Sequence, residues 1–359
     1  MPARARGEQA RARAEPTRRE QASNGSAPGP EGVLGIQRAR ILAAITELVR
    51  EQGVAGITVA HIVGRSGVSR RTFYDLFTDR DDCLLAAFEQ ALGRAAAVVL
   101  PAYAGTGSVV GRAAARATVA RANGSADPWE ARIRDGLAAL LGFLDEDPAS
   151  GGLLVVDALA AERPVLERRA RVVETLIDAV NQGGARPHGG PGRRPKRIVA
   201  EGTVGAVLAI VHSRLSGRDP KPLVGLLNQL MGMIVLPYRG EEAAERELGR
   251  PAPKPRKRPQ PAPADPLREL DMRLTYRTVR VLQAIAELGG QGSHPSSREV
   301  ADASGITDQG QMSKLLWRLD HLGLIANGAD GHVRGEPNAW SLTPRGEQVQ
   351  KAIRAQTGR

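Results

Sequence analysis

Arg70 and Arg71 are adjacent arginines near the start of a short segment, SRRTFYDLF, whose residue types suggest a specific chemistry. Each guanidinium can donate two parallel hydrogen bonds to the edge of a guanine, the commonest specific contact between a side chain and a base. Thr72, beside them, adds a hydroxyl that can also bond to base edges. The segment therefore predicts direct reading of double-stranded DNA, with Arg70 and Arg71 on base edges and Thr72 in support.

Two short helices joined by a tight turn, between Ile57 and Leu85, are expected to hold this segment. Thr58 and Ser69 are residue types that cap helix N-termini, and Gly67 lacks the Cβ that would crowd a sharp turn. Apolar spacing turns one face of each helix inward, at Val59, Ile62, Val63, Phe73, Leu76 and Phe77. The start and outer face of the second helix, where a recognition helix contacts DNA, then carry Arg70, Arg71, Thr72 and Tyr74.

The run VSRRTFYDLFTDRDD and its surroundings, Gln37 to Leu92, resemble the N-terminal domain of TetR-type transcriptional regulators. The glycine turn, the serine cap, the aromatic residues and the acidic cluster from Asp79 to Asp82 stand at that family's offsets. Arg80 stands where the family often has lysine, and it keeps the charge. The resemblance implies that phosphates are contacted by Thr58, Ser69, Tyr74 and Arg80.

The overall composition is compatible with a nucleic-acid partner. The chain has 359 residues, of which 42% are apolar, enough for two or three domains, and its net charge is +11. Such a charge favours a polyanion, either DNA or a membrane surface, and the helix-turn-helix pattern decides for DNA. No signal core and no apolar run near the roughly 18 residues of a membrane span is evident, so we expect a cytoplasmic protein without a membrane partner.

Sequence signatures of catalysis or cofactor binding are absent. The six histidines are scattered, without an HExxH motif or cysteine partners, so no metal site is predicted. Neither a GxSxG elbow nor a dinucleotide fingerprint occurs, and we expect no enzyme activity and no cofactor. The single cysteine, Cys83, excludes a disulfide within one chain and is interpreted as a small buried hydrophobe.

Residues 83–240 are predicted to form a helical body behind a DNA-binding domain of residues 33–82. Cys83 to Leu100 continues as one helix, and three more helices fall between Trp129 and Gln182. Their order also resembles the TetR family, which implies a cavity for a small apolar effector between them. The candidates for its lining, for which ordinary core packing is the alternative, are Trp129, Leu137, Leu140, Phe143, Leu144, Leu153, Leu159 and Leu176.

Two further helices, Ile198 to Leu215 and Leu223 to Leu236, complete the predicted body. The first carries small residues that allow another helix to approach closely, at Gly202, Gly205, Ala206 and Ala209. In the resembled family the last two body helices pair with those of a second copy; packing within one chain is the alternative. A homodimer is favoured, because two recognition helices related by a twofold axis read half-sites roughly 34 to 36 Å apart.

Residues 267–359 form a second predicted domain. Ser296 caps a short helix, Gly305 supplies a turn, and the amphipathic helix DQGQMSKLLWRLDHLG follows. The segments LIAN and AWSLTPRG then predict a two-stranded wing and a final helix. This order resembles the winged-helix domains of MarR-like regulators, with protein docking as the alternative to DNA binding. The candidate DNA contacts are Gln309, Gln311, Lys314, Arg318 and Arg334.

Two remaining segments have the composition of disorder and of a spacer. Residues 1–32 are interpreted as a disordered basic tail, and residues 249–266 as a proline-rich basic linker. Together the patterns predict an all-α homodimer with a helix-turn-helix head, a helical body and a C-terminal winged helix carrying a small β-hairpin. The predicted function is a sequence-specific, ligand-responsive repressor. A sequence-tolerant DNA-organising protein is the alternative.

Overall fold

The computed structural model describes residues 30–105, 128–184, 195–217, 221–251, 270, 275–290, 294–328 and 338–357. The chain divides into two compact units, one of residues Leu34–Leu274 and one of Thr275–Arg359 with Met1–Val33. Most of the predicted tail and linker, together with Arg334, lies outside the described residues. The described part is mostly helical, as expected.

The head of the first unit consists of three helices and the start of a fourth: α1 Pro30–Gln52, α2 Val59–Ser66, α3 Arg70–Leu76 and α4 Arg80–Tyr103. Gly53 ends α1 with a φ of 70°, and Gly67 joins α2 to α3 with a φ of 64°. Both values lie in the left-handed region that glycine adopts without steric cost. The predicted turn residue is therefore confirmed, and it fixes the angle between α2 and α3.

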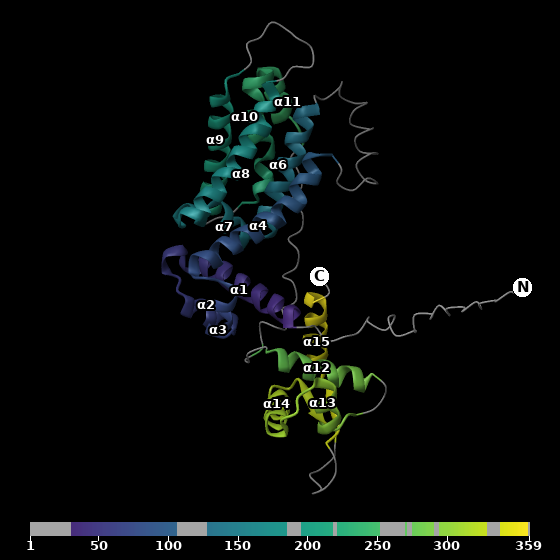
Figure 1. Ribbon diagram of the computed structural model, residues 1–359. Coiled ribbons are helices and arrows are strands. Elements are labelled where there is room, and N and C mark those ends of the chain that lie inside the picture. Colours follow the sequence, from purple (N-terminus) through teal and green to yellow (C-terminus); the bar gives the residue numbers. More distant parts are fainter. Residues whose placement is uncertain are drawn as a thin grey trace, which may run out of the picture. The chain divides into compact units, whose positions relative to one another are not determined.

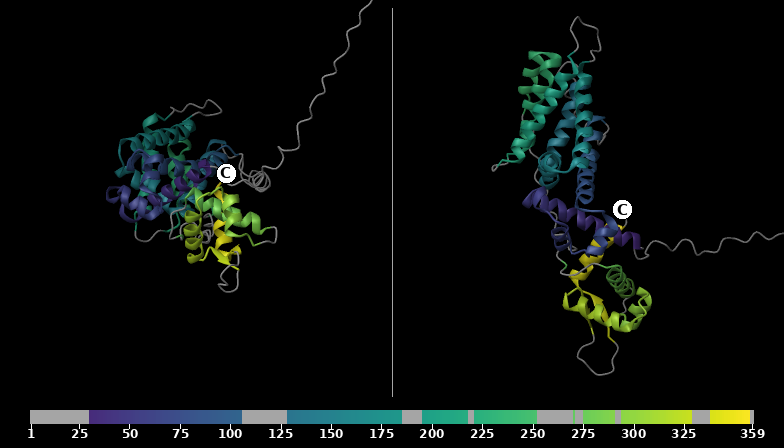
Figure 2. Two further views of the ribbon diagram at one scale, coloured as in Figure 1. Left: turned by 60° about the horizontal axis from the view of Figure 1, so that its bottom comes forward. Right: turned by 60° about the vertical axis from the view of Figure 1, so that its left-hand side comes forward.

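The described residues of the body form the helices α6 Pro128–Glu146, α7 Pro148–Val155, α8 Arg163–Asn181, α9 Arg197–Leu215, α10 Leu227–Arg239 and α11 Glu241–Leu248. The long helices α6, α8, α9 and α10 run side by side, and α4 enters among them from the head (Figures 1 and 2). Prolines occupy the first turns of α6, α7 and α8, where a missing amide donor is tolerated. The three helices α6, α7 and α8 correspond to the three predicted between Trp129 and Gln182.

Helix α11 was not anticipated, because the predicted body ended at residue 240. It packs on α10, and its Glu247 is only 2% exposed. Arg134 of α6 forms an ion pair with Glu247 and donates a hydrogen bond of 2.6 Å to the Asn228 side-chain oxygen. A buried carboxylate requires such a partner, so α11 belongs to the body.

Helices α4 and α9 are long and apolar enough, by length and composition alone, to cross a membrane. This finding corrects the expectation that no apolar run approaches that length. Alanines between the larger apolar residues raise the mean hydropathy without forming an obvious apolar run. Helix α4 contributes Cys83, Leu84 and Phe88 to the protein core. Only 17% of the apolar window of α9 is buried, which leaves a largely uncovered face.

The second unit contains α12 Tyr276–Gly289, α13 Ser297–Ser304, α14 Gln309–His321, β1 Ile325–Asn327, β2 Trp340–Leu342 and α15 Pro344–Thr357. The two strands are antiparallel, with Ile325 opposite Leu342 and Asn327 opposite Trp340. Ser296 and Glu299 form a reciprocal capping box at the start of α13. A Cβ at Gly346 would collide with the carbonyl oxygen of Leu324, so this glycine allows α15 to approach the hairpin.

Candidate nucleic-acid interface

Helix α3 exposes two arginines to solvent, and its opposite face packs against the core of the head. The Ser69 side chain accepts a hydrogen bond of 3.0 Å from the Thr72 amide and so caps the helix. Phe73 and Phe77 are buried in the head core, where their rings lie 5.6 Å apart. Arg70 and Arg71 are exposed, and Tyr74 is 50% exposed. The short helix therefore has a packed inner face and an outer face that carries both guanidinium groups.

Hydroxyl side chains cap the starts of both α2 and α3. The Thr58 hydroxyl accepts a hydrogen bond of 3.3 Å from the His61 amide and caps α2. The Ser69 and Thr72 hydroxyl oxygens lie 2.8 Å apart, so one of them donates to the other. The second of the two keeps its proton for an acceptor outside the chain. The geometry suits donation to a phosphate oxygen while the helix caps stay intact.

Arg80 lies in a different environment from Arg70 and Arg71. Its guanidinium is paired with Asp81, at 2.7 Å, and donates to the Ile57 carbonyl oxygen at 3.4 Å. Asp79 accepts hydrogen bonds of 2.9 Å from the amides of Asp81 and Asp82 and caps α4. The structure thus gives Arg80 a bracing role between α4 and the segment before α2. A phosphate contact from Arg80 would have to compete with Asp81.

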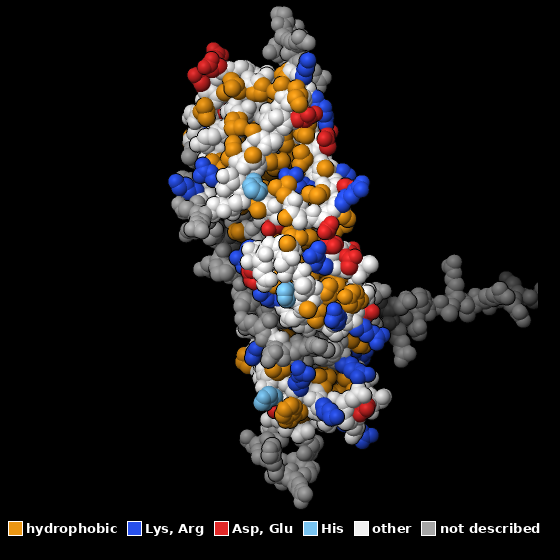
Figure 3. Space-filling view, turned by 90° about the vertical axis from the view of Figure 1, so that its left-hand side faces the viewer, with side chains coloured by type: hydrophobic (Ala, Val, Ile, Leu, Met, Phe, Trp, Pro, Cys, Tyr) orange, Lys and Arg blue, Asp and Glu red, His pale blue; other side chains and the backbone are white. Residues whose placement is uncertain are grey.

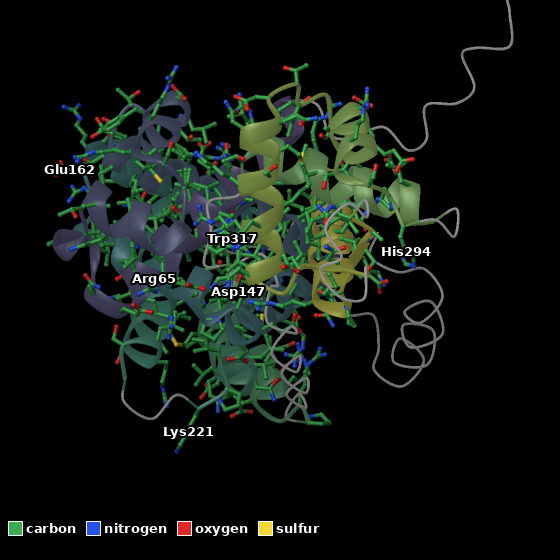
Figure 4. All side chains as sticks on the ribbon, turned by 90° about the horizontal axis from the view of Figure 1, so that it is seen from below. Arg65, Asp147, Glu162, Lys221, His294 and Trp317 are labelled. Atoms are coloured by element: carbon green, nitrogen blue, oxygen red, sulfur yellow. The ribbon has the colours of Figure 1, made fainter. Side chains whose placement is uncertain are left out.

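Helix α2 is anchored to α1 by Arg65, which Figure 4 labels. The Arg65 guanidinium donates two hydrogen bonds to Glu51, of 3.0 and 2.7 Å. The hydrogen bond from Arg65 lowers the pKa of the Glu51 carboxyl below its usual value. Exposed pairs of this kind stabilise little, but a two-point contact fixes orientation. The pair helps to fix the orientation of α2 relative to α1.

Helix α14 of the second unit presents most of the second set of candidates. Gln309, Lys314 and Arg318 are exposed, whereas the Gln311 oxygen accepts a hydrogen bond from Arg277. Sequence reasoning missed Trp317, which is 66% exposed and stacks on His321 with ring centres 5.3 Å apart (Figure 4). The signal was available, because inward residues at 312, 316 and 319 leave position 317 outside.

An apolar cavity of about 190 Å³ lies between α4, α6, α7, α8, α9 and α10 of the body. Among the predicted lining residues, four do line it: Leu137, Leu140, Leu144 and Leu176. Sequence reasoning missed the valines of α8 and α9 and one charged residue, Arg169 of α8. A helix-by-helix hydrophobic pattern identifies buried faces but not the cavity between them.

The other four predicted lining residues lie elsewhere. Trp129 is buried in the far end of the body, where its indole nitrogen donates to the Ala179 carbonyl oxygen at 3.1 Å. Phe143 packs against the core of the body, outside the cavity. Leu153 belongs to the core cluster shared with the head, and Leu159 is 49% exposed on a 3₁₀ turn. These corrections remove Trp129, Phe143, Leu153 and Leu159 from the cavity.

The single cysteine, Cys83, is buried in the core of the head. Burial, followed by the charge of Asp82, raises the pKa of the Cys83 thiol to about 12, so this cysteine stays protonated. Across the described ranges, no three His, Cys, Asp or Glu side chains converge as metal ligands.

Comparison with known proteins identifies the head. Residues 41–87 match the sequence profile of bacterial regulatory proteins of the tetR family. This range covers most of α1, all of α2 and α3, and the start of α4. Residues 41–87 therefore form a TetR-family helix-turn-helix, which implies a DNA-binding transcriptional regulator, and the regulators that this profile describes are not enzymes. No curated protein matches the chain.

Proposed function

We propose that the chain is a ligand-responsive repressor that binds one DNA site as a homodimer and acts in the cytoplasm. The observation that carries this proposal is the outer face of α3, where Arg70 and Arg71 are exposed on a capped helix with a packed inner face. In this reading Arg70 and Arg71 contact base edges, with Thr72 in support. Phosphate contacts are assigned to Thr58, Ser69, Tyr74 and Arg80, of which Arg80 must first be released from Asp81.

A homodimer through α9 and α10 is supported by the open face of α9. Gly202 and Gly205 are exposed, and a Cβ at either position would meet no atom within 4 Å. Packing within one chain therefore does not account for these two small residues. Hydrophobic side chains gather on this side of the body (Figure 3), and Ile198, Met233 and Leu236 are exposed on α9 and α10. Such a surface is suited to a second copy.

Coupling between ligand and DNA is supported by a core cluster that head and body share. Leu153, Ala158, Ala161 and Val165 of the body pack in the same cluster as Phe73 and Phe77 of the head. Helix α4 belongs to this cluster and also lines the cavity through Phe88. Because packed cores shift between discrete arrangements, a ligand between the body helices would bias the position of the head. Release from DNA requires only that the ligand bind the released form better.

Selection of bound sites from random duplexes tests the proposal. We expect enrichment of a twofold-symmetric site whose half-sites lie about one helical turn, roughly 34 to 36 Å, apart. Binding measured at two salt concentrations should weaken for every duplex while the ratio of specific to non-specific affinity remains large. No enriched sequence and a uniform loss with salt would instead support the alternative, a sequence-tolerant DNA-organising protein.

For residues 267–359 we propose a winged-helix domain that touches DNA through α14. The exposed Lys314 and Arg318 support this assignment. Replacing both with alanine in the full chain is expected to weaken binding evenly across sequences and to reduce the salt slope by roughly four, one for each cation that the proposed dimer loses. The salt dependence of fluorescence anisotropy measures this. An unchanged slope would assign the surface around Trp317 to protein docking instead.

A further inference from the structure

Among the described residues, one charged residue lines the apolar cavity in the body. Nearly all of the side chains that line it are aliphatic or aromatic, contributed by α4, α6, α8 and α9. Arg169 of α8 is the only charged residue among the described residues of the lining, and it is half-buried. A guanidinium beside valines and leucines has lost part of its hydration and favours a counter-charge in compensation.

Two other arginines of α8 have carboxylate partners among the described residues, whereas Arg169 has none. Arg163 pairs with Glu167 at 2.7 Å, and Arg168 pairs with Glu89 of α4 at 3.1 Å. Arg169 has no hydrogen-bond or ion-pair partner among the residues that the structure describes. Its guanidinium therefore keeps its donors for a molecule in the cavity.

The position of Arg169 gives the cavity a direction. The lining part of α8 runs from Arg169 to Val180, and these two positions lie on the order of 16 Å apart along the helix. Arg169 lies toward the head, since Val165, one turn earlier, belongs to the core cluster shared with the head. Tyr103 marks the other end, where its hydroxyl donates to the Gln182 side chain at 3.3 Å. A long apolar space with a cation at its head-side end fits a chain with an acidic terminus.

We infer that the cavity takes an amphipathic anion, a linear alkyl chain ending in a carboxylate, with the carboxylate on Arg169 and the chain extending toward Tyr103. This inference rests on the proposed function, because it names the chemical class of the effector. The planar guanidinium matches a carboxylate through two parallel hydrogen bonds. A cationic ligand is disfavoured by Arg169, and a neutral chain leaves the guanidinium without a partner.

The test uses dodecanoate as the probe, below the concentration at which it forms micelles, with the full chain and isothermal titration calorimetry. Dodecanol and dodecyltrimethylammonium carry the same chain with no charge and with the opposite charge. We expect dodecanoate to bind about 10- to 100-fold more tightly than dodecanol, the range of a charge-assisted hydrogen bond. The ammonium should bind more weakly than either.

Arg169→Gln is expected to lower dodecanoate affinity to that of dodecanol while leaving dodecanol binding unchanged, and Arg169→Lys should restore part of the difference. Arg168→Gln is the matched control, because it removes the adjacent guanidinium, which is paired with Glu89. It should leave both affinities unchanged. Circular dichroism of each variant checks folding, and the comparison of the three probes on the unaltered chain needs no variant.

Three results would overturn the inference: no binding of dodecanoate, equal affinity for dodecanoate and dodecanol, or a loss in Arg168→Gln as large as in Arg169→Gln. The proposed function is tested separately by adding dodecanoate to the complex with the selected DNA. If dodecanoate binds through Arg169 and DNA affinity does not change, the ligand class stands and ligand-responsive repression fails. If dodecanoate dissociates the DNA complex of the unaltered chain and that of the Arg169→Gln variant equally, ligand-responsive repression stands. The assignment of a carboxylate ligand to Arg169 then fails.

Discussion

Replacing both Arg70 and Arg71 with alanine is expected to abolish the choice of DNA site and to leave weak, salt-sensitive attachment. Both side chains are exposed on α3 and do not support the head core, so the fold should persist. Each bidentate contact to a base contributes roughly 1 to 3 kcal/mol of discrimination. Because a dimer presents the pair twice, the ratio of specific to non-specific affinity should fall by about 10³-fold or more. Fluorescence anisotropy with the selected duplex and a scrambled duplex measures both affinities.

The matched control for this variant removes two arginines from the body. Arg163 and Arg171 are exposed on α8, so Arg163→Ala with Arg171→Ala lowers the net charge equally. That variant should retain the specificity ratio. If the Arg70 and Arg71 variant also retained it, α3 would not be the element that reads bases. If the body variant lost it too, total charge rather than the position of the guanidinium groups would govern binding.

The helix-turn-helix could be predicted because its signals are local. Thr58, Gly67 and Ser69 each determine a conformation within three residues of themselves, through a cap or a left-handed turn. The inward residues of α3 follow from helical spacing alone. For the same reason, the N-terminal cap at Ser296 and the turn at Gly305, which ends α13, were predicted correctly. Elements set by near neighbours in the sequence need no knowledge of tertiary contacts.

The cavity could be predicted only in part, because its lining depends on which helices meet. Leu153 and Leu144 are both buried leucines, but Leu153 packs with the head and Leu144 lines the cavity. Helical spacing identifies both as buried and cannot distinguish their neighbours. From sequence alone, a charged residue such as Arg169 is expected on a solvent-exposed face of its helix. That it lines the cavity follows only from the packing of α8 with α4, α6 and α9.

The environment of Arg80 illustrates the same limit for a charged side chain. Arg80 pairs with Asp81, the next residue in the sequence, but it also contacts the Ile57 carbonyl oxygen, 23 residues away in the sequence. Family resemblance assigns Arg80 to phosphate without information about these competing acceptors. The assignment of Arg70 and Arg71 does not share this difficulty, because both are exposed at the start of α3.

Introducing leucine at both Gly202 and Gly205 of α9 is expected to convert the dimer to a monomer and to stabilise the protomer. A Cβ at either position meets no atom of the described residues within 4 Å, so we expect the leucines to leave the packing of the protomer intact. Leucine also favours a helix over glycine by roughly 0.8 to 1 kcal/mol at each position. A second copy, however, could no longer approach α9 closely. Sedimentation velocity measures the oligomeric state, and affinity for the selected duplex should fall by about 10²- to 10⁴-fold.

A variant whose protomer is more stable but whose DNA binding is weaker has lost the dimer interface. A variant with a damaged fold would instead have a less stable protomer. Gly93→Leu on α4 is the matched control, since Gly93 is also exposed, helical and without an atom within 4 Å of its Cβ position. With one glycine replaced instead of two, it should gain about half as much helix stability and keep both the oligomeric state and the DNA affinity. A Gly202 and Gly205 variant that remained dimeric would show that α9 is not the interface. One that became less stable would place these glycines within the packing of a single chain, the alternative interpretation of the same small residues.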